Sequence, residues 1–258
     1  MDLSTRFMKV FDVEKGFMGS GITKLRHIIA PSVSYRYQHA PTFNASQLNQ
    51  FDAAIDGLSQ NHVISFSIEN KIQGKRGSRT VDLIRAVTSM DYNIRQKGAP
   101  GQLGPVTNLI EVTPVDWLKL VSETTFDHRN MRLTASNLDM YIVNGNKFGV
   151  SIGDRFARGQ SEQFVTQVAW VVNPKWRFKV YESFQPFNRL NLKEQQYTIT
   201  RDLHEWQVSL IYNQTRGVGN EVMMTFTLKA FPEQPLDLFG TTFHQRKAGS
   251  QSDTALPI

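Results

Sequence analysis

The chain has 258 residues, of which 40% are hydrophobic and 20% are charged, and it contains no cysteine. Its 17 Phe, 7 Tyr and 4 Trp exclude bulk disorder, and the missing cysteine excludes a disulfide scaffold and a cysteine-ligated zinc or iron–sulfur site. The net charge of +6 is compatible with anionic partners, but the basic residues are scattered, as on an ordinary solvated surface.

Nothing in the sequence predicts a membrane helix or a secretion signal. No run approaches the roughly 18 consecutive apolar residues of a membrane helix. The first seven residues, MDLSTRF, contain no apolar segment of the kind found in signal peptides. Neither observation excludes a membrane β-barrel, because its alternating strands average to a polar composition.

In chain order, apolar and polar residues alternate over most of the sequence. The alternating runs lie at 33–37, 64–72, 84–94, 148–152, 164–170, 176–180, 206–212 and 222–230. Turn-forming segments such as Asn144-Gly145-Asn146 and Asn173-Pro174 separate them. Strict alternation predicts half-buried strands, and we expect roughly ten to twelve of them.

Two segments depart from this pattern. In FDAAIDGL, Phe51, Ile55 and Leu58 have helical spacing, which predicts a short helix in a long loop near 40–60. From Pro232 onward the alternation is lost. We therefore predict strands over 1–231 and a loose C-terminal tail over 232–258.

The length of the alternating runs favours a membrane. Strands of globular proteins average about 5–6 residues, whereas a strand that crosses a bilayer needs about 9–11. Many of these runs are long enough to cross, and aromatic residues such as Trp170, Trp176 and Trp206 lie near their ends, as in interfacial girdles. The predicted fold is an antiparallel transmembrane β-barrel. A soluble β-sandwich or lipocalin-like barrel remains the alternative, because its strands also alternate.

Two short motifs resemble catalytic or phosphate-binding signatures. Gly149-Val150-Ser151-Ile152-Gly153 matches G-x-S-x-G, but a nucleophile elbow needs a helix directly afterwards, and the following residues head into a turn. We interpret it as a strand with small residues where a neighbour approaches closely. The glycine-rich segment from Gly16 to Lys24 lacks the Gly-Lys-Ser/Thr of a phosphate loop, so we expect a hairpin loop there.

No residue pattern predicts a metal, a cofactor or nucleic acid. The six histidines have no H-x-H or H-x-x-x-H spacing, and Asp52 and Asp56 fit a solvated face of the loop helix. In Trp176-Arg177-Phe178-Lys179-Val180-Tyr181 aromatic and basic residues alternate. A strand with rings on one face and cations on the other explains this more simply than base stacking does.

Several segments together resemble one protein family. They are RHIIAPSVSYRYQHAP (26–41), FDAAIDGL (51–58), NHVISFSIENKIQGKR (61–76), RDLHEWQVSL (201–210) and FTLKAFPE (226–233). In this order they resemble the C-terminal barrel region of the LPS-assembly outer-membrane protein family (LptD, also called organic solvent tolerance protein). The resemblance extends from about Leu25 to Glu233.

The resemblance implies an integral outer-membrane barrel that inserts lipopolysaccharide into the outer leaflet. It implies four partners: lipopolysaccharide, outer-membrane lipid, a plug lipoprotein, and a periplasmic bridge that delivers lipid through an N-terminal domain. In the family, lipid leaves sideways between the first and last strands. A joint between two strand edges is where a barrel can open without breaking a continuous ladder. No covalent bond changes, so the resemblance implies no enzyme activity, no catalytic residues and no cofactor.

The last run, Asn220 to Phe231, resembles the final strand of the family and hence one lip of the gate. Four of its residues are expected to face lipid: Val222, Met224, Phe226 and Leu228. Three are expected to face the lumen: Thr225, Thr227 and Lys229. Pro232 and Pro235 would stop further pairing, because proline cannot donate to a ladder.

The chain departs from the family in two ways. Many members carry cysteines near the segment that corresponds to Asp202-Leu203-His204, whereas here Glu205 follows and a disulfide-controlled assembly switch is excluded. About eleven strands are also too few for the family's large barrel, so we expect part of a longer protein. A self-contained small barrel competes with this expectation. The alternative functions are a generic porin or diffusion channel and a soluble β-rich binding domain.

Overall fold

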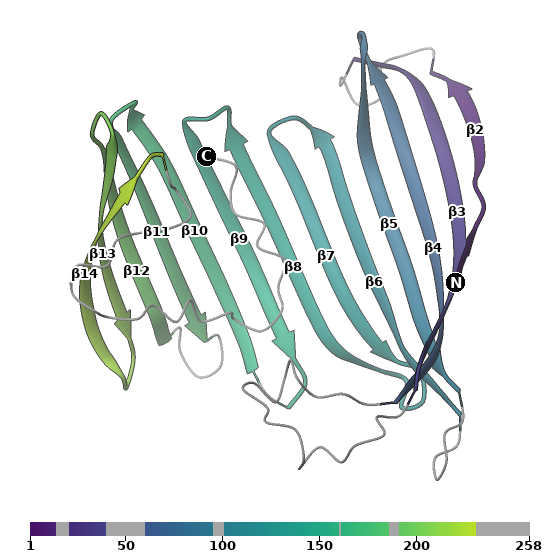
Figure 1. The fold of residues 1–258 in the computed structure, drawn as a ribbon. Helices are drawn as coiled ribbons and strands as arrows, with labels where there is room; N and C mark the ends of the chain where they lie inside the picture. Colours follow the sequence, from purple (N-terminus) through teal and green to yellow (C-terminus); the bar gives the residue numbers. More distant parts are fainter. Residues whose placement is uncertain (14–20, 40–59, 95–100, 160, 186–190, 231–258) are drawn as a thin grey trace. The chain divides into compact units, whose positions relative to one another are not determined.

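A computed structural model describes residues 1–13, 21–39, 60–94, 101–159, 161–185 and 191–230. Within them, fourteen strands form one sheet (Figure 1). The first seven are β1 (Asp2–Ser4), β2 (Phe7–Asp12), β3 (Ile22–Gln38), β4 (Asn61–Arg76), β5 (Arg79–Asn93), β6 (Gln102–Val115) and β7 (Leu118–Asp127). The others are β8 (Arg132–Asn144), β9 (Phe148–Ala157), β10 (Ser161–Asn173), β11 (Trp176–Gln185), β12 (Asn191–Asp202), β13 (Trp206–Thr215) and β14 (Gly219–Leu228).

This architecture confirms the predicted all-β antiparallel class. From β3 to β14 each strand pairs with the next strand in the sequence, as expected for a chain of hairpins. In the described part of the chain, no helix has the length and apolar character needed to cross a membrane. The chain divides into two compact units, Met1–Pro114 with Ser122–Ala135 and Val115–Val121 with Ser136–Ile258.

The strand count exceeds the predicted ten to twelve because several strands lack a clean alternation. β7 begins Leu-Lys-Leu-Val but continues Ser-Glu-Thr-Thr, and β12 is largely polar on both faces over its first half. β1 and β2 are short. The predicted last strand, 220–231, ends instead at Leu228, and a turn follows. The predicted helix at 51–58 and the tail at 232–258 lie outside the described residues.

β1 and β2 are one strand interrupted by a proline in its neighbour. Leu3 lies opposite Val33 and Phe7 lies opposite Ile29, so the register against β3 is the same on both sides of the break. At the break, the Thr5 N–H donates to the Pro31 carbonyl at 3.2 Å. Pro31 has no N–H with which to return the bond, and the ladder fails there.

Each unit has an apolar face that no second layer of described residues covers. Directly opposed residues on paired strands share a face. In the first unit Val33, Phe66, Met90 and Val106 form one such row. In the second unit the row Phe148, Trp170, Phe178, Ile199, Leu210 and Met224 crosses six strands.

These apolar side chains remain accessible. Phe66 is 42% exposed, Trp170 52% and Val222 69%. Among the described residues, the buried apolar side chains are Ile22, Leu83, Ala169 and Met223. A sheet of a soluble domain buries one face against another layer, and neither unit does so within the described residues.

The connections differ in length at the two ends of the strands. Those after β4, β6, β8, β10 and β12 span only two or three residues each, and we call this the short-turn end. The opposite end includes the long intervals 39–60 and 94–101. All four tryptophans lie in or near the short turns: Trp117, Trp170, Trp176 and Trp206. At the opposite end, Tyr35 and Tyr37 pack edge-on against His62.

Pro31→Ala should join β1 and β2 into one strand. The new N–H can donate to the Thr5 carbonyl, which adds one ladder hydrogen bond with a net contribution of about 1 kcal/mol. Amide hydrogen exchange at Leu3, Thr5 and Phe7 is expected to slow by roughly fivefold. Ser32→Ala, which adds no donor, is the control. Unchanged exchange rates in Pro31→Ala would refute this explanation of the break.

Candidate functional site: the polar face

In the first unit, the face opposite the apolar row carries a linked set of charges. Arg85 Nε lies 2.7 Å from Glu69 Oε1, and Arg85 Nη1 lies 3.0 Å from Glu111 Oε2, so one guanidinium joins β4, β5 and β6. Lys71 Nζ lies 3.7 Å from both Glu69 and Asp82. Each carboxylate in this set has a cation partner, which keeps half-buried charges compensated.

The same face continues with uncharged hydrogen-bonding groups. Ser89 Oγ and Thr107 Oγ1 are 2.7 Å apart on this face. Arg26 Nε donates to Gln73 Oε1 at 2.8 Å. The alternation of the sequence does not by itself predict these groups as a set. The sequence does indicate that Glu69, Lys71 and Gln73 share a face, because they occupy alternate positions of one run. Their partners on neighbouring strands depend on the register of the sheet, which the sequence does not reveal.

In the second unit, the polar face has a hollow of about 220 Å³. Its lining includes Gln167, Ala169, Lys179, Tyr181, Gln196 and Thr198. Ala169 and Thr198 lie directly opposite Lys179 on the flanking strands. Lys179 is exposed and forms no salt bridge among the described residues. The hollow therefore presents one ammonium group among neutral hydrogen-bonding side chains.

Gly153 provides space for an ion pair. Arg155 Nη2 lies 2.6 Å from Asp139 Oδ1, and a Cβ on Gly153 would lie 2.5 Å from that oxygen and 2.9 Å from Arg155 Nη1. The motif Gly149–Gly153 lies in β9, followed by a turn and β10. The close approach predicted for its small residues is found, whereas the strand–turn–helix context of a nucleophile elbow is absent from this segment.

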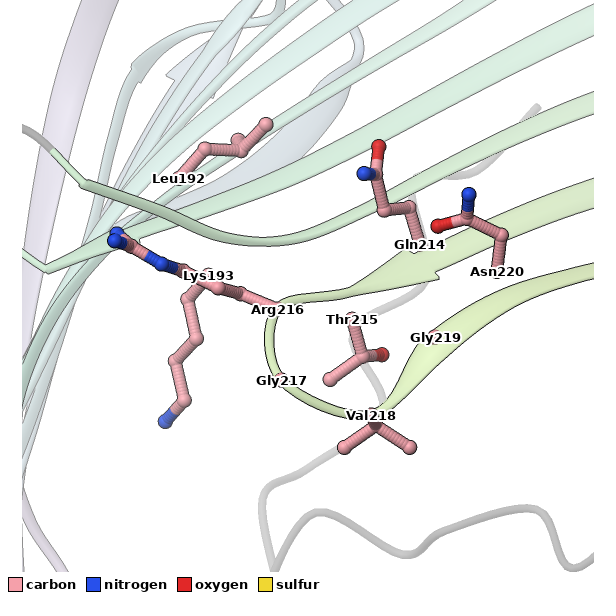
Figure 2. Close-up of a pocket in the computed structure, with 9 residues that line it drawn as sticks. All are labelled: Leu192, Lys193, Gln214, Thr215, Arg216, Gly217, Val218, Gly219 and Asn220. Carbon is pink, nitrogen blue, oxygen red and sulfur yellow. The ribbon is translucent and has the colours of Figure 1, made fainter.

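A second hollow, of about 560 Å³, lies at the β13–β14 hairpin (Figure 2). It is lined largely by the turn Thr215–Gly219, with Leu192, Lys193, Gln214 and Asn220 around it. The Arg216 N–H donates to the Lys193 carbonyl at 2.9 Å. Figure 2 shows Gln214 and Asn220 on one side of the hairpin and the Lys193 chain extending away from them. These side chains do not converge on one point. We therefore interpret the hollow as the open surface beside a hairpin turn and not as a ligand pocket.

The structure places the predicted gate residues on and after β14. Val222, Met224, Phe226 and Leu228 lie opposite Tyr212, Leu210, Val208 and Trp206, on the apolar face. Thr225 and Thr227 lie opposite Ser209 and Gln207, on the polar face. Met223 is a buried apolar residue on that polar face. Lys229 lies beyond the strand, and its Nζ is 2.5 Å from Asp202 Oδ1. Whether these faces meet lipid and lumen stays a prediction.

The remaining sequence candidates form no site in the described residues. No group of three or more His, Asp or Glu there could hold a metal ion. The glycine-rich segment is described only from Gly21, after which β3 begins at Ile22. Asp52 and Asp56 lie outside the described residues. Trp176, Phe178 and Val180 share the apolar face, while Arg177, Lys179 and Tyr181 share the other, as the alternation predicts.

Comparison with known proteins gives only distant structural similarity. No family model and no curated protein matches the chain. Among solved structures, two mutants of the Rh. blastica porin are similar with a TM-score of 0.39 and 7% identity, and a third with 0.38 and 6%. In each case 88% of both chains is covered.

Gly153→Val should destabilise the protein by displacing the Arg155–Asp139 ion pair. The added side chain would overlap both partners, and overpacking of this kind costs about 1–3 kcal/mol. The expected result is a lower urea midpoint for protein reconstituted in lipid vesicles. Ser151→Ala, on the same face of the same strand, should leave the midpoint nearly unchanged. Equal midpoints for Gly153→Val and the unaltered protein would contradict the account.

Proposed function

We propose that the chain forms part of the wall of an outer-membrane β-barrel whose polar face lines a water-filled passage. The apolar faces carry this proposal. Phe66 is 42% exposed and Trp170 52%, and each belongs to a row of apolar residues across several strands. Lipid is the solvent in which such rows need no covering layer, and β-barrels cross membranes because every backbone group is paired between strands.

The polar face supports a passage for polar solutes. In the first unit this face carries compensated charges such as Glu69–Arg85–Glu111, and in the second unit the polar face carries neutral groups such as Gln167 and Thr198. These are the groups that line water-filled barrels. The shorter connections at one end of the strands and the longer intervals at the other also match outer-membrane barrels, which have short periplasmic turns and longer external loops. On this basis the short-turn end faces the periplasm.

The number of strands supports a larger barrel. Since β1 and β2 share one register against β3, the order contains thirteen strand positions. The first and the thirteenth then run in the same direction. An antiparallel barrel has an even number of strands, so antiparallel closure requires an odd number of strands beyond those described.

An apolar outer face and a polar inner face are sufficient for a diffusion channel.

LPS export is a second candidate function, and the position of β14 in the sheet favours it. Among the described strands β14 pairs only with β13, and its alternate residues lie on opposite faces of the sheet. With its apolar face toward acyl chains and its polar face toward sugars, this strand has the chemistry of a lateral gate. The sequence resemblance to the LPS-assembly family supports the same candidate, with lipopolysaccharide, a plug lipoprotein and a periplasmic bridge as partners.

Lys179→Glu should shift the ion selectivity of the channel toward cations. Lys179 is an exposed cation on the polar face, and fixed charge in a pore selects the opposite charge. In planar bilayers containing the full-length protein, the cation-to-anion permeability ratio is expected to rise by about twofold. Lys9→Glu, on the apolar face beside Phe11, is the charge-matched control and should not change the ratio.

The same preparation discriminates between the candidate functions. Conductance with the predicted selectivity shift supports a diffusion channel. Two results together support the LPS-assembly candidate. The protein does not conduct ions in the bilayer, and its depletion from cells prevents newly made lipopolysaccharide from reaching the outer leaflet. Recovery of the native protein in the soluble fraction would overturn both and favour a soluble binding domain.

A further inference from the structure

The apolar face of the second unit contains one basic residue at the short-turn end. Arg201 lies opposite Trp176 on one side and Val208 on the other, so it shares their face. The next row on this face is Trp170, Phe178, Ile199, Leu210 and Met224. A cation at the margin of an apolar surface requires a partner or water for its charge.

The guanidinium of Arg201 packs on an aromatic ring and retains unused hydrogen-bond donors. Its Cζ lies 5.1 Å from the centre of the Trp176 ring. Within the described residues, Arg201 forms no salt bridge, and its side chain is exposed. A cation–π contact uses the face of the guanidinium and leaves the in-plane N–H groups free for an anion.

Aromatic and basic residues surround this position. Trp170 is 52% exposed and Trp206 is 37% exposed. Lys175 is exposed in the turn that directly precedes Trp176. Asn173 Oδ1 accepts hydrogen bonds from the Lys175 and Trp176 N–H groups at 2.9 and 3.1 Å, which fixes that turn.

The nearby acidic groups leave an excess of positive charge. The Asp202 carboxylate is compensated by Lys229 Nζ at 2.5 Å. Glu205 is exposed in the turn that follows. Arg201 and Lys175 outnumber this one carboxylate. We call these two residues, together with the rings of Trp170, Trp176 and Trp206, the basic–aromatic margin.

We propose that the basic–aromatic margin binds the phosphate of an anionic phospholipid headgroup, with Arg201 as the central donor. Tryptophan rings prefer the headgroup level of a bilayer, and each Lys or Arg near an anionic lipid surface adds favourable electrostatic energy. The planar guanidinium suits bidentate binding of a phosphate. The proposal rests on the proposed membrane location and adds a lipid class and a site to it.

The test uses the chain's own tryptophans. The full-length protein is reconstituted in vesicles of brominated phosphatidylglycerol or brominated phosphatidylcholine, and quenching of tryptophan fluorescence is compared. For the unaltered protein, we expect the quenching to show that phosphatidylglycerol binds at the basic–aromatic margin about fivefold more tightly than phosphatidylcholine does. Arg201→Gln should abolish this preference, while Arg201→Lys, which keeps the charge, should retain part of it.

Arg177→Gln is the matched control. It removes the same charge from the residue next to Trp176, but on the polar face, opposite Thr200, and should leave the preference intact. Equal quenching by both lipids, no change in Arg201→Gln, or equal loss in Arg177→Gln would overturn the proposal. If neither brominated lipid quenches the tryptophans, the membrane location itself has failed.

Discussion

The structure depends on one constraint: both units expose an apolar face for which the described residues provide no cover. In water, leaving such rows exposed would forfeit roughly 25 cal/mol for each square ångström of apolar surface. The row through Phe148, Trp170 and Phe178 therefore requires an apolar environment. In the proposed membrane location, a bilayer would supply that environment without a second protein layer.

The polar face meets the opposite requirement. A charged side chain on this face needs either contact with water or an oppositely charged partner, and the face contains examples of both. Arg85 links two carboxylates from neighbouring strands, while Lys179 stands among neutral groups in a hollow. Gly153 shows how the backbone contributes, because only a residue without a side chain leaves space for the Arg155–Asp139 pair.

Sequence alone predicted the features that follow from alternation. In 206–212 and 222–228, the assignment of alternate residues to opposite faces follows directly from a period of two. The register confirms it, because apolar residues of one strand pair with apolar residues of the other. β7 and β12 were missed because their polar residues occupy both faces, so no period marks them. The Arg85 and Arg155 ion pairs were missed because their partners belong to other strands, and a partner across a sheet is fixed by register and not by spacing.

The ends of elements were predicted less well. The last strand stops at Leu228 because Lys229 and Ala230 form a turn, three residues before the predicted limit at Phe231. The strand that pairs with β3 is divided into β1 and β2 because of Pro31. This effect could not be predicted without knowing that Thr5 lies opposite Pro31. The first miss comes from a local turn, and the second comes from a contact between segments far apart in the sequence.

The measurement that tests the central claim most directly is the accessibility of alternate positions along β13. The chain has no cysteine, so each introduced thiol is unique. In vesicles, Ser209→Cys is expected to react with a membrane-impermeant maleimide, and Leu210→Cys is expected to stay unreacted until detergent replaces the lipid. Reaction of Leu210→Cys in vesicles as fast as that of Ser209→Cys would contradict a lipid-facing apolar row and, with it, the membrane barrel.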